Sequence, residues 1–270
     1  MRGRVLAIAG SDSSGGAGMQ ADVKTITALG AYAATAITAI TVQDSRAVHA
    51  IHKLPPSLVG QQIARALADP GADAVKTGML VDAPTIAAVA GALRAAAGVP
   101  LVVDPVMLAS SGARLLAENA LGALRAELFP LAALVTPNVP EAEILAGMKI
   151  RDRASMERAA CAIGARAVLV KGGHLPGQTV VDVLATEAGV IVFEQPRIPG
   201  VPCRGTGCTL ASAIAAGLAQ GMGLADAVGR ARAYLQAAIA TAPAVGAGPR
   251  PLDHAVTVDL RRIEFTPEPG

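Results

Sequence analysis

The chain has 270 residues and a net charge of +2, which gives no bulk electrostatic reason to expect nucleic-acid binding. Its three cysteines, Cys161, Cys203 and Cys208, form neither a disulfide framework nor a paired metal-ligand spacing, and the first apolar run ends at Gly10, too early for a membrane segment. We therefore expect one cytoplasmic domain over residues 1–270, with no membrane or nucleic-acid partner.

The N-terminal part of the chain alternates apolar runs with loops and helical patterns. Residues 5–9 are continuously apolar and predict a buried parallel strand. A hydroxyl-rich glycine loop follows over 10–18, and then a helix over 19–29 that Gly30 ends. A second strand is expected over 35–42.

The remainder continues the same alternation. The expected elements are helix 57–68, strand 72–76, helix 83–97, strand 101–103, helix 119–127, strand 132–135, helices 142–145 and 153–164, strand 167–170, a hairpin of strands 180–184 and 190–193, helices from 206 and over 224–240, and a strand-like piece at 255–258. Repeated strand–loop–helix units predict an α/β fold, in which helices cover both faces of a mostly parallel sheet and the hairpin lies at its edge.

A polar-glycine turn at residues 204–208 runs directly into an alanine-rich helix. Gly205 and Gly207 permit close backbone approaches, and Thr206 is expected to cap the helix. The first N–H groups of a helix have no internal acceptor and lie at the positive end of its dipole, so this turn can hold a phosphate. Cys208 then faces the anion, where the dipole lowers a thiol pKa. The alternative is a capped helix with a small buried cysteine, like Cys161, which we expect to be buried and inert.

Polar side chains follow most of the expected strands directly. They are Asp12, Gln43, Asp44, Lys76, Asp104, Asn138, Glu141, Lys171 and His174. Because the carboxyl ends of parallel strands share one edge of a sheet, these residues predict an active site there. Asp104, Asn138 and Glu141 supply oxygen ligands suited to Mg²⁺, although Glu141 can also be an acid at a helix N-terminus. Acids, lysines and a phosphate turn together suggest phosphoryl transfer.

A dinucleotide site is the competing hypothesis. Residues 16–21 match the pattern G-x-G-x-x-A, and Asp44 ends the next strand, as a ribose-binding acid does. The fingerprint should follow the first strand directly, however, and residues 11–15 intervene. A P-loop of the Walker A type is also absent from the sequence, because no Gly-Lys dipeptide occurs.

The chain resembles the hydroxymethylpyrimidine/phosphomethylpyrimidine kinases of thiamine biosynthesis over residues 4–240. The matching blocks, in the family's order, are AGSDSSGGAGMQAD at 9–22, KTGML at 76–80, VDPVM at 103–107, TPNVPEAE at 136–143, VKGGH at 170–174 and GTGCTL at 205–210. The resemblance implies a ribokinase-like three-layer fold, ATP and Mg²⁺ as cofactors, a small-molecule substrate and usually a homodimer. The implied activity phosphorylates 4-amino-5-hydroxymethyl-2-methylpyrimidine and then converts its monophosphate to the diphosphate.

The resemblance also implies roles for residues in the matching blocks. The pyrimidine pocket would be formed by Gly10, Asp22, Gln43, Met79 and Val106. Among these, the Gln43 amide can donate and accept hydrogen bonds at an aminopyrimidine edge. Mg²⁺ would be held by Asp104 and Glu141, and the nucleotide by Asn138, Lys171, Gly172 and Thr206. The anion hole would consist of Gly205, Gly207 and Cys208, and Cys208 would take the proton of the substrate hydroxymethyl group.

Two positions depart from the family pattern. Arg204 stands where the family commonly has His, and its guanidinium can bind phosphate bidentately or be solvated. Asp44-Ser45 follows Gln43 where Asn-Thr is more usual. These departures leave a pyridoxal kinase of the same fold as an alternative. An NAD(P)-binding oxidoreductase and a non-catalytic nucleotide-binding module are the alternatives from other classes.

Overall fold

The computed structural model describes residues 1–108, 112, 114–200 and 202–258. Within these residues the strands are β1 (Arg4–Asp12), β2 (Tyr32–Gln43), β3 (Val48–Lys53), β4 (Ala74–Thr77), β5 (Leu101–Val103), β6 (Leu134–Val135), β7 (Ala167–Lys171), β8 (Thr179–Thr186) and β9 (Gly189–Pro196). They form one sheet in the order β3-β2-β1-β4-β5-β6-β7-β8-β9. The strands from β2 to β7 in that order are parallel, whereas β3, β8 and β9 pair antiparallel with β2, β7 and β8.

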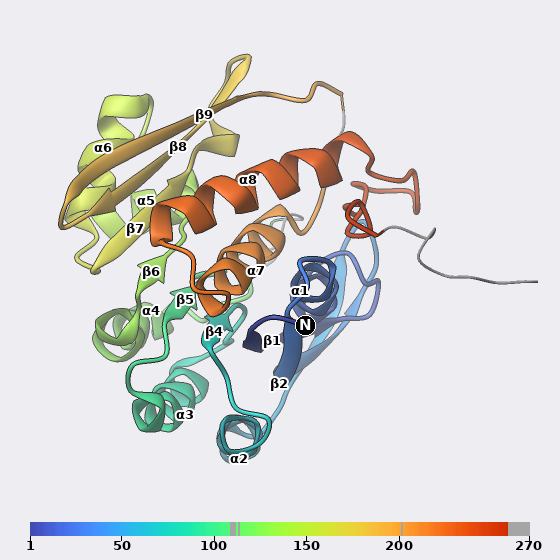
Figure 1. Cartoon of the computed structure of the whole chain (residues 1–270), viewed down its shortest axis with the longest axis vertical. Helices are drawn as coiled ribbons and strands as arrows, with labels where there is room; N and C mark the ends of the chain where they lie inside the picture. Colours follow the sequence, from blue (N-terminus) through green and yellow to red (C-terminus); the bar gives the residue numbers. More distant parts are fainter. Residues whose placement is uncertain (109–111, 113, 201, 259–270) are drawn as a thin grey trace, which may run out of the picture.

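Helices cover both faces of this sheet, which gives three layers (Figure 1). Their bounds are α1 (Gly18–Ala28), α2 (Pro56–Ala68), α3 (Ala83–Leu93), α4 (Ala120–Ala123), α5 (Val139–Ala146), α6 (Arg153–Ala162), α7 (Thr206–Ala219) and α8 (Leu224–Ala240). Helices α1, α7 and α8 pack on one face, and α2 to α6 pack on the other. The predicted mostly parallel α/β fold and its β8–β9 edge hairpin are therefore confirmed.

The alternation of side chains along β1 divides the core into two parts. Leu6 and Ile8 face the layer of α2 to α6, whereas Val5 and Ala7 face α1, α7 and α8. Both faces of a central parallel strand are buried, which explains why this strand is apolar at successive positions. On the second face, Gly217 of α7 leaves no room for a side chain: a Cβ there would lie 2.9 Å from the Cβ of Ala227, so α8 crosses α7 closely.

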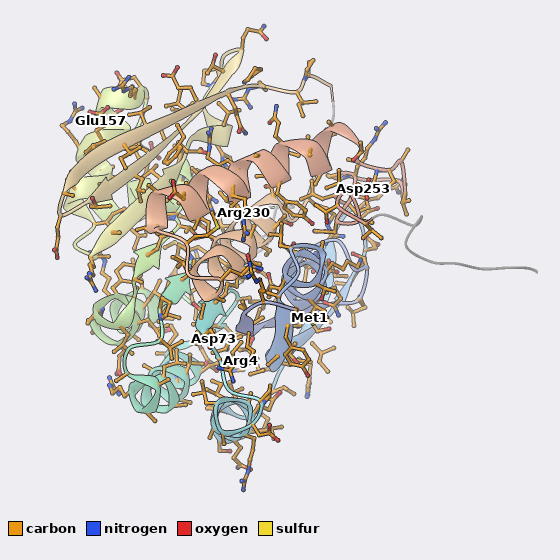
Figure 2. All side chains as sticks on the ribbon, viewed as in Figure 1. Met1, Arg4, Asp73, Glu157, Arg230 and Asp253 are labelled. Atoms are coloured by element: carbon orange, nitrogen blue, oxygen red, sulfur yellow. The ribbon has the colours of Figure 1, made fainter. Side chains whose placement is uncertain are left out.

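At the amino-terminal ends of the parallel strands, Arg4 connects the start of β1 to the turn before β4. Its Nη2 lies 2.6 Å from Oδ1 of Asp73, and the two side chains lie together in Figure 2. Nη1 of Arg4 also donates to the carbonyl oxygen of Pro70 at 2.7 Å. Because both charged side chains are exposed, this pair aligns the strand ends more than it stabilises the fold.

Three segments differ from the sequence-based expectations. Strand β3 was not predicted, because its largely exposed residues include His49, His52 and Lys53 and carry no apolar alternation. The expected strand at 255–258 is wrong: residues 254–257 form a turn, with a backbone bond from Val258 N to the Ala255 oxygen, and no strand lies alongside them among the described residues. The expected helix at 119–127 is α4 followed by a wider π-type turn over Leu124–Leu128.

The sequence Ser110-Ser111-Gly112 also predicts a loop, and positions 110 and 111 lie outside the described residues. Among the helices in the described part of the chain, none combines the length and the apolar character needed to cross a bilayer.

Candidate active site

A cavity of about 710 Å³ lies at the carboxyl edge of the parallel strands. Its walls include every polar residue that the sequence placed at this edge except Lys76, which is fully buried. The parallel topology explains the convergence, because the segments after β1, β2, β5, β6 and β7 all leave the sheet on the same side. The predicted clustering of these residues is therefore confirmed.

Asp12 organises the glycine loop after β1. Its carboxylate accepts hydrogen bonds from the backbone N–H groups of Ser14, Gly16 and Ala17, at 2.9, 3.1 and 2.8 Å. A Cβ on Gly18, whose φ is +54°, would lie 2.5 Å from the carbonyl oxygen of Gly10. The loop is thus folded tightly over the end of its own strand, and Asp12 has a structural role in it.

Arg204 joins this loop to the start of α7. The side chain is buried, with Nη2 2.8 Å from Oδ2 of Asp12, and Nη1 donates to Oγ of Ser14 and to the carbonyl oxygen of Asp44 at 3.1 Å. The expectation of a solvated guanidinium is wrong, because Arg204 is buried. Three of its N–H donors are engaged by Asp12, Ser14 and Asp44, and phosphate binding by Arg204, which lines the cavity, stays a prediction. Arg204 instead fixes the glycine loop against the turn between β2 and β3.

The turn before α7 has the geometry of an anion hole, with one correction. Gly205 is the N-cap, in the left-handed region at φ +77°, and Thr206 is the first helical residue and does not cap the helix with its side chain. A Cβ at position 205 would overlap the carbonyl oxygen of Gly16, so this position requires glycine. Because the first intrahelical bond runs from Thr209 N to Gly205 O, the amides of residues 206–208 are free of intrahelical acceptors at the cavity.

Lys171 and Asp104 lie directly at this turn. A Cβ on Gly207 would lie 3.2 Å from Nζ of Lys171 and 3.5 Å from Oδ2 of Asp104. The two side chains form an ion pair at 2.8 Å, and Oδ1 of Asp104 also accepts from Oγ1 of Thr136 at 3.2 Å. Burial alone would lower the pKa of Lys171, but the carboxylates of Asp104 and Glu141 raise it by a larger amount. The net shift is upward, so the ammonium stays charged.

Asn138 and Glu141 form a capping box at the start of α5. Oε2 of Glu141 accepts from the Asn138 backbone N–H at 2.9 Å, and Oδ1 of Asn138 accepts from the Glu141 backbone N–H at 2.9 Å. Oε1 of Glu141 accepts from the backbone N–H of Met107 at 3.1 Å. Burial raises the pKa of Glu141. The structure therefore places Glu141 at the cavity and also confirms the capping role that the sequence left open.

Cys208 lies in the first turn of α7 and lines the cavity, but its electrostatics differ from the expectation. Burial raises the pKa of its thiol to about 11, although the nearby Lys76 ammonium acts in the opposite direction. Desolvation of the thiolate thus outweighs the attraction of the Lys76 ammonium here. Cys161 also departs from expectation, because it is exposed on α6.

Asp22 is not part of the cavity wall. It is fully buried on α1, where both carboxylate oxygens accept from Nζ of Lys76, at 2.8 and 2.9 Å, and Oγ of Ser212 donates to Oδ1 at 2.8 Å. Burial lowers the pKa of Lys76, but the Asp22 carboxylate and its neighbours raise it more, which keeps the ammonium charged beneath the site. In this structure the buried Asp22–Lys76 pair lies beneath the cavity wall and does not line it.

The other proposed substrate residues lie in the cavity wall together. Gly10, Gln43, Met79 and Val106 all line it, and a Cβ on Gly10 would lie 3.0 Å from Sδ of Met79. Oγ1 of Thr41 lies 3.0 Å from the carbonyl oxygen of Ser11 and 3.2 Å from Oε1 of Gln43, so these two acceptors share its one proton and the Gln43 amide is turned toward Thr41. This end of the cavity combines apolar walls with one oriented amide.

Gly172 is a packing position beside the cavity. A Cβ there would overlap the carbonyl oxygen of Val181, and its backbone N–H donates to Oδ1 of Asp182 at 2.8 Å. The next residues, Gly173 and His174, do line the cavity. Burial lowers the pKa of His174, with the Lys171 charge acting in the same direction.

Three charged residues of the wall were missed at the sequence level. Arg46 in the turn after β2, Asp182 on β8 and Arg197 after β9 all line the cavity and belong to none of the motifs. A carboxylate inside the apolar run Val180–Leu184 was the available signal for Asp182, because a buried acid requires partners. Arg197 offered no such signal.

The free amides at the start of α7, the lysine–aspartate pair beside them and the Gln43 amide among apolar wall residues indicate a small-molecule phosphotransferase on a three-layer α/β fold. The family model described as phosphomethylpyrimidine kinase matches residues 12–253. The chain belongs to this family, and the resemblance seen in the sequence is confirmed.

Relatives and solved structures agree with this assignment. The chain is 48% identical over 255 residues to the hydroxymethylpyrimidine/phosphomethylpyrimidine kinase of Rhizobium meliloti, covering 92% of this chain and 96% of that one. It is 49% identical to a thiamine biosynthesis bifunctional protein of Geobacter sulfurreducens, covering 96% of this chain but spanning about half of that longer protein, 53%. The pyridoxal kinase of Staphylococcus aureus in complex with ADP superposes with a TM-score of 0.88 at 34% identity, covering 96% and 95% of the two chains. The ribokinase-like fold is thereby confirmed.

These comparisons overturn the oxidoreductase hypothesis. The residues that suggested it have other roles, because the glycine loop folds around Asp12 and the Asp44 carboxylate accepts from the backbone N–H groups of Arg46 and Ala47 and contacts His49. The chain is a phosphotransferase, and the ADP complexes among its structural neighbours support the use of ATP.

Proposed function

We propose that the chain phosphorylates 4-amino-5-hydroxymethyl-2-methylpyrimidine with ATP and then converts the monophosphate to the diphosphate, in thiamine biosynthesis. The observation that carries this proposal is the position of the free α7 amides. They lie beside the Lys171–Asp104 pair, in a cavity that Gln43 and Met79 also line, and the chain is 48% identical to a kinase of that name. A phosphoryl group held there has the acceptor on one side and the nucleotide on the other.

The substrate end suits an aminopyrimidine. Gln43 is the proposed reader of the pyrimidine amine and ring nitrogen, with Gly10, Met79 and Val106 packing on the ring. Asp22 would not contact the substrate. It would influence the site through Lys76, with which it forms a buried ion pair.

Transfer would depend on the turn before α7. The amides of Thr206, Gly207 and Cys208 stabilise negative charge on the transferred group, and the Lys171 ammonium lies beside them. Cys208 is the proposed acceptor of the hydroxymethyl proton. Because its thiol pKa is raised, the Lys76 charge beneath it is needed to favour the thiolate.

The donor set fits a magnesium ion held largely through water and phosphate oxygens. Oδ1 of Asp104 accepts from Lys171 and Thr136, which leaves Oδ2 facing the turn as a ligand. Both oxygens of Glu141 already accept backbone hydrogen bonds, so Glu141 would act through bound water. When bound, Mg²⁺ would neutralise phosphate charge and align the nucleotide at Asn138 and Lys171.

Three broader expectations complete the proposal. Residues 1–270 would form one kinase domain, because the described strands all belong to one sheet. A homodimer is the proposed assembly, and the exposed apolar side chains of Ile40 and Val42 near the end of β2 are its candidate contacts. A reducing cytoplasm is the proposed location, since the three cysteines are all free.

A coupled ADP-release assay tests the function. Hydroxymethylpyrimidine, its monophosphate and pyridoxal are compared side by side, and both pyrimidines are expected to be turned over with the higher kcat/KM. Pyridoxal belongs in the comparison because pyridoxal kinases are close structural neighbours. A preference for pyridoxal would make that the function, and nucleotide binding without turnover of any of the three would indicate a non-catalytic module.

A further inference from the structure

The loop that follows β7 contributes Gly173 and His174 to the cavity wall, and one side chain binds the carbonyl groups of its residues 173–177. Arg197, just after β9, donates from Nη1 to the carbonyl oxygen of Gly173 at 2.9 Å, from Nη2 to Leu175 at 2.6 Å, and from Nε to Gly177 at 2.8 Å. Its backbone N–H donates to the carbonyl oxygen of Gln178 at 2.7 Å. One guanidinium thus binds three alternate carbonyls, which a flexible loop would otherwise turn toward water.

The start of the same loop is anchored from the opposite side. Oδ1 of Asp182 accepts from the backbone N–H of Gly172, and its Oδ2 lies 2.7 Å from Nε of Arg232. Asp182 and Arg232 are both buried, and Arg232 lies over the ring of Phe193. Gly172 is therefore fixed to β8 and α8, whereas the residues beyond it depend on Arg197.

The loop is short of other constraints. Within it, the structure gives the backbone bond from Leu175 N to the Gly172 oxygen at 3.0 Å, which closes a single turn. Lys171 immediately precedes the loop and pairs with Asp104 at the anion turn. Any displacement of the loop would therefore move Gly173 and His174, which line the cavity directly after Lys171.

We infer that Arg197 is a positioning residue for the nucleotide. It holds the loop 173–177 in the shape that the nucleotide end of the cavity requires, without contacting the reacting atoms. This inference rests on the proposed function in taking the end opposite Gln43 as the nucleotide end. Pre-ordering the loop removes an entropic cost that nucleotide binding would otherwise bear.

The test compares Arg197→Met, which keeps the length of the side chain and loses all its donors, with Arg197→Lys and a matched control, Arg153→Met. Arg153 is an exposed residue of α6 that pairs with Glu157, and it does not line the cavity. Arg197→Met is expected to weaken Mg²⁺-ADP binding in calorimetry, and to raise KM for ATP, by about tenfold. The KM for hydroxymethylpyrimidine and kcat should change less than about twofold. Arg197→Lys should fall between, and Arg153→Met should match wild type.

Hydrogen exchange of the nucleotide-free protein gives an independent readout. The amides of 173–178 should exchange faster in Arg197→Met, while those of α6 and β8 stay unchanged. Wild-type ADP affinity together with wild-type exchange in Arg197→Met would overturn the inference, as would an equal rise in both KM values. If Arg197→Met does not fold, Arg197→Gln, which retains an amide donor, is measured in its place.

The ADP measurement also separates this inference from the proposed function. A wild-type protein that binds ADP but does not phosphorylate the pyrimidine would refute the function, and the ADP comparison would still decide the role of Arg197. A wild-type protein without ADP affinity would overturn the inference itself.

Discussion

The raised pKa of Cys208 leads to a prediction about its reactivity. With a pKa of about 11, the thiolate fraction is on the order of 10⁻⁴ at pH 7 and should rise about tenfold per pH unit up to that pKa. A cysteine activated by the helix dipole would instead be largely ionised by pH 8. The assay is the iodoacetamide alkylation rate between pH 7 and pH 10, measured by intact mass in a Cys161→Ser/Cys203→Ser background so that one thiol is left.

The same residue should show its function in turnover. Cys208→Ala is expected to lose roughly 10²–10⁴ in kcat, the usual contribution of a positioned proton acceptor, with a Tm close to wild type because only a small side chain is removed. Cys203→Ala, which removes the other cavity-lining thiol, is the control and should retain its kcat. An alkylation rate that levels off below pH 9 would refute the burial argument. Full activity in Cys208→Ala would leave the turn with an anion-binding role only.

Three further predictions follow. Gln43→Leu should lower kcat/KM for hydroxymethylpyrimidine roughly ten- to hundredfold, because polar substrate groups would be left unpaired, while the KM for ATP stays constant; normal turnover would remove Gln43 from the pocket. Activity should vanish with a chelator and return with Mg²⁺, and Asp104→Asn should require more Mg²⁺ for half-maximal rate than Asp73→Asn, a surface control; ADP release in excess chelator would contradict a metal role. Burial lowers the pKa of His254 from 6.5 to about 4, so the unfolded state binds the proton first as pH falls. The contribution of neutral His254 to the free energy of unfolding is fully present above pH 6.5, and about 3 kcal/mol of it should be lost between pH 6.5 and pH 4. The free energy of unfolding of His254→Gln, measured with urea, should not show this loss between pH 6.5 and pH 4. If wild type and His254→Gln lose stability in parallel as the pH falls, the prediction is refuted.

Much of the fold could be predicted from the chain because its signals are local. The apolar run at 5–9 predicts a strand that is buried on both faces. The glycine turn at 205–207 predicts the start of a helix, because the residues on either side of it encode that start. The order of strands and loops then placed Asp104 and Lys171 at one edge of the sheet, since parallel strands end on the same side. Strand β3 escaped prediction because an exposed edge strand needs no apolar alternation.

The state of individual side chains was decided by partners far away in the sequence. Arg204 is an internal clamp because Asp12, 192 positions earlier, lies within 2.8 Å of it. Asp22 is withdrawn from the cavity because it neutralises Lys76, 54 positions later. The helix start around Cys208 was visible in the sequence, but its pKa was not, because the free energy of a buried charge depends on solvent exclusion and on distances to other charges, and both exist only in the folded chain.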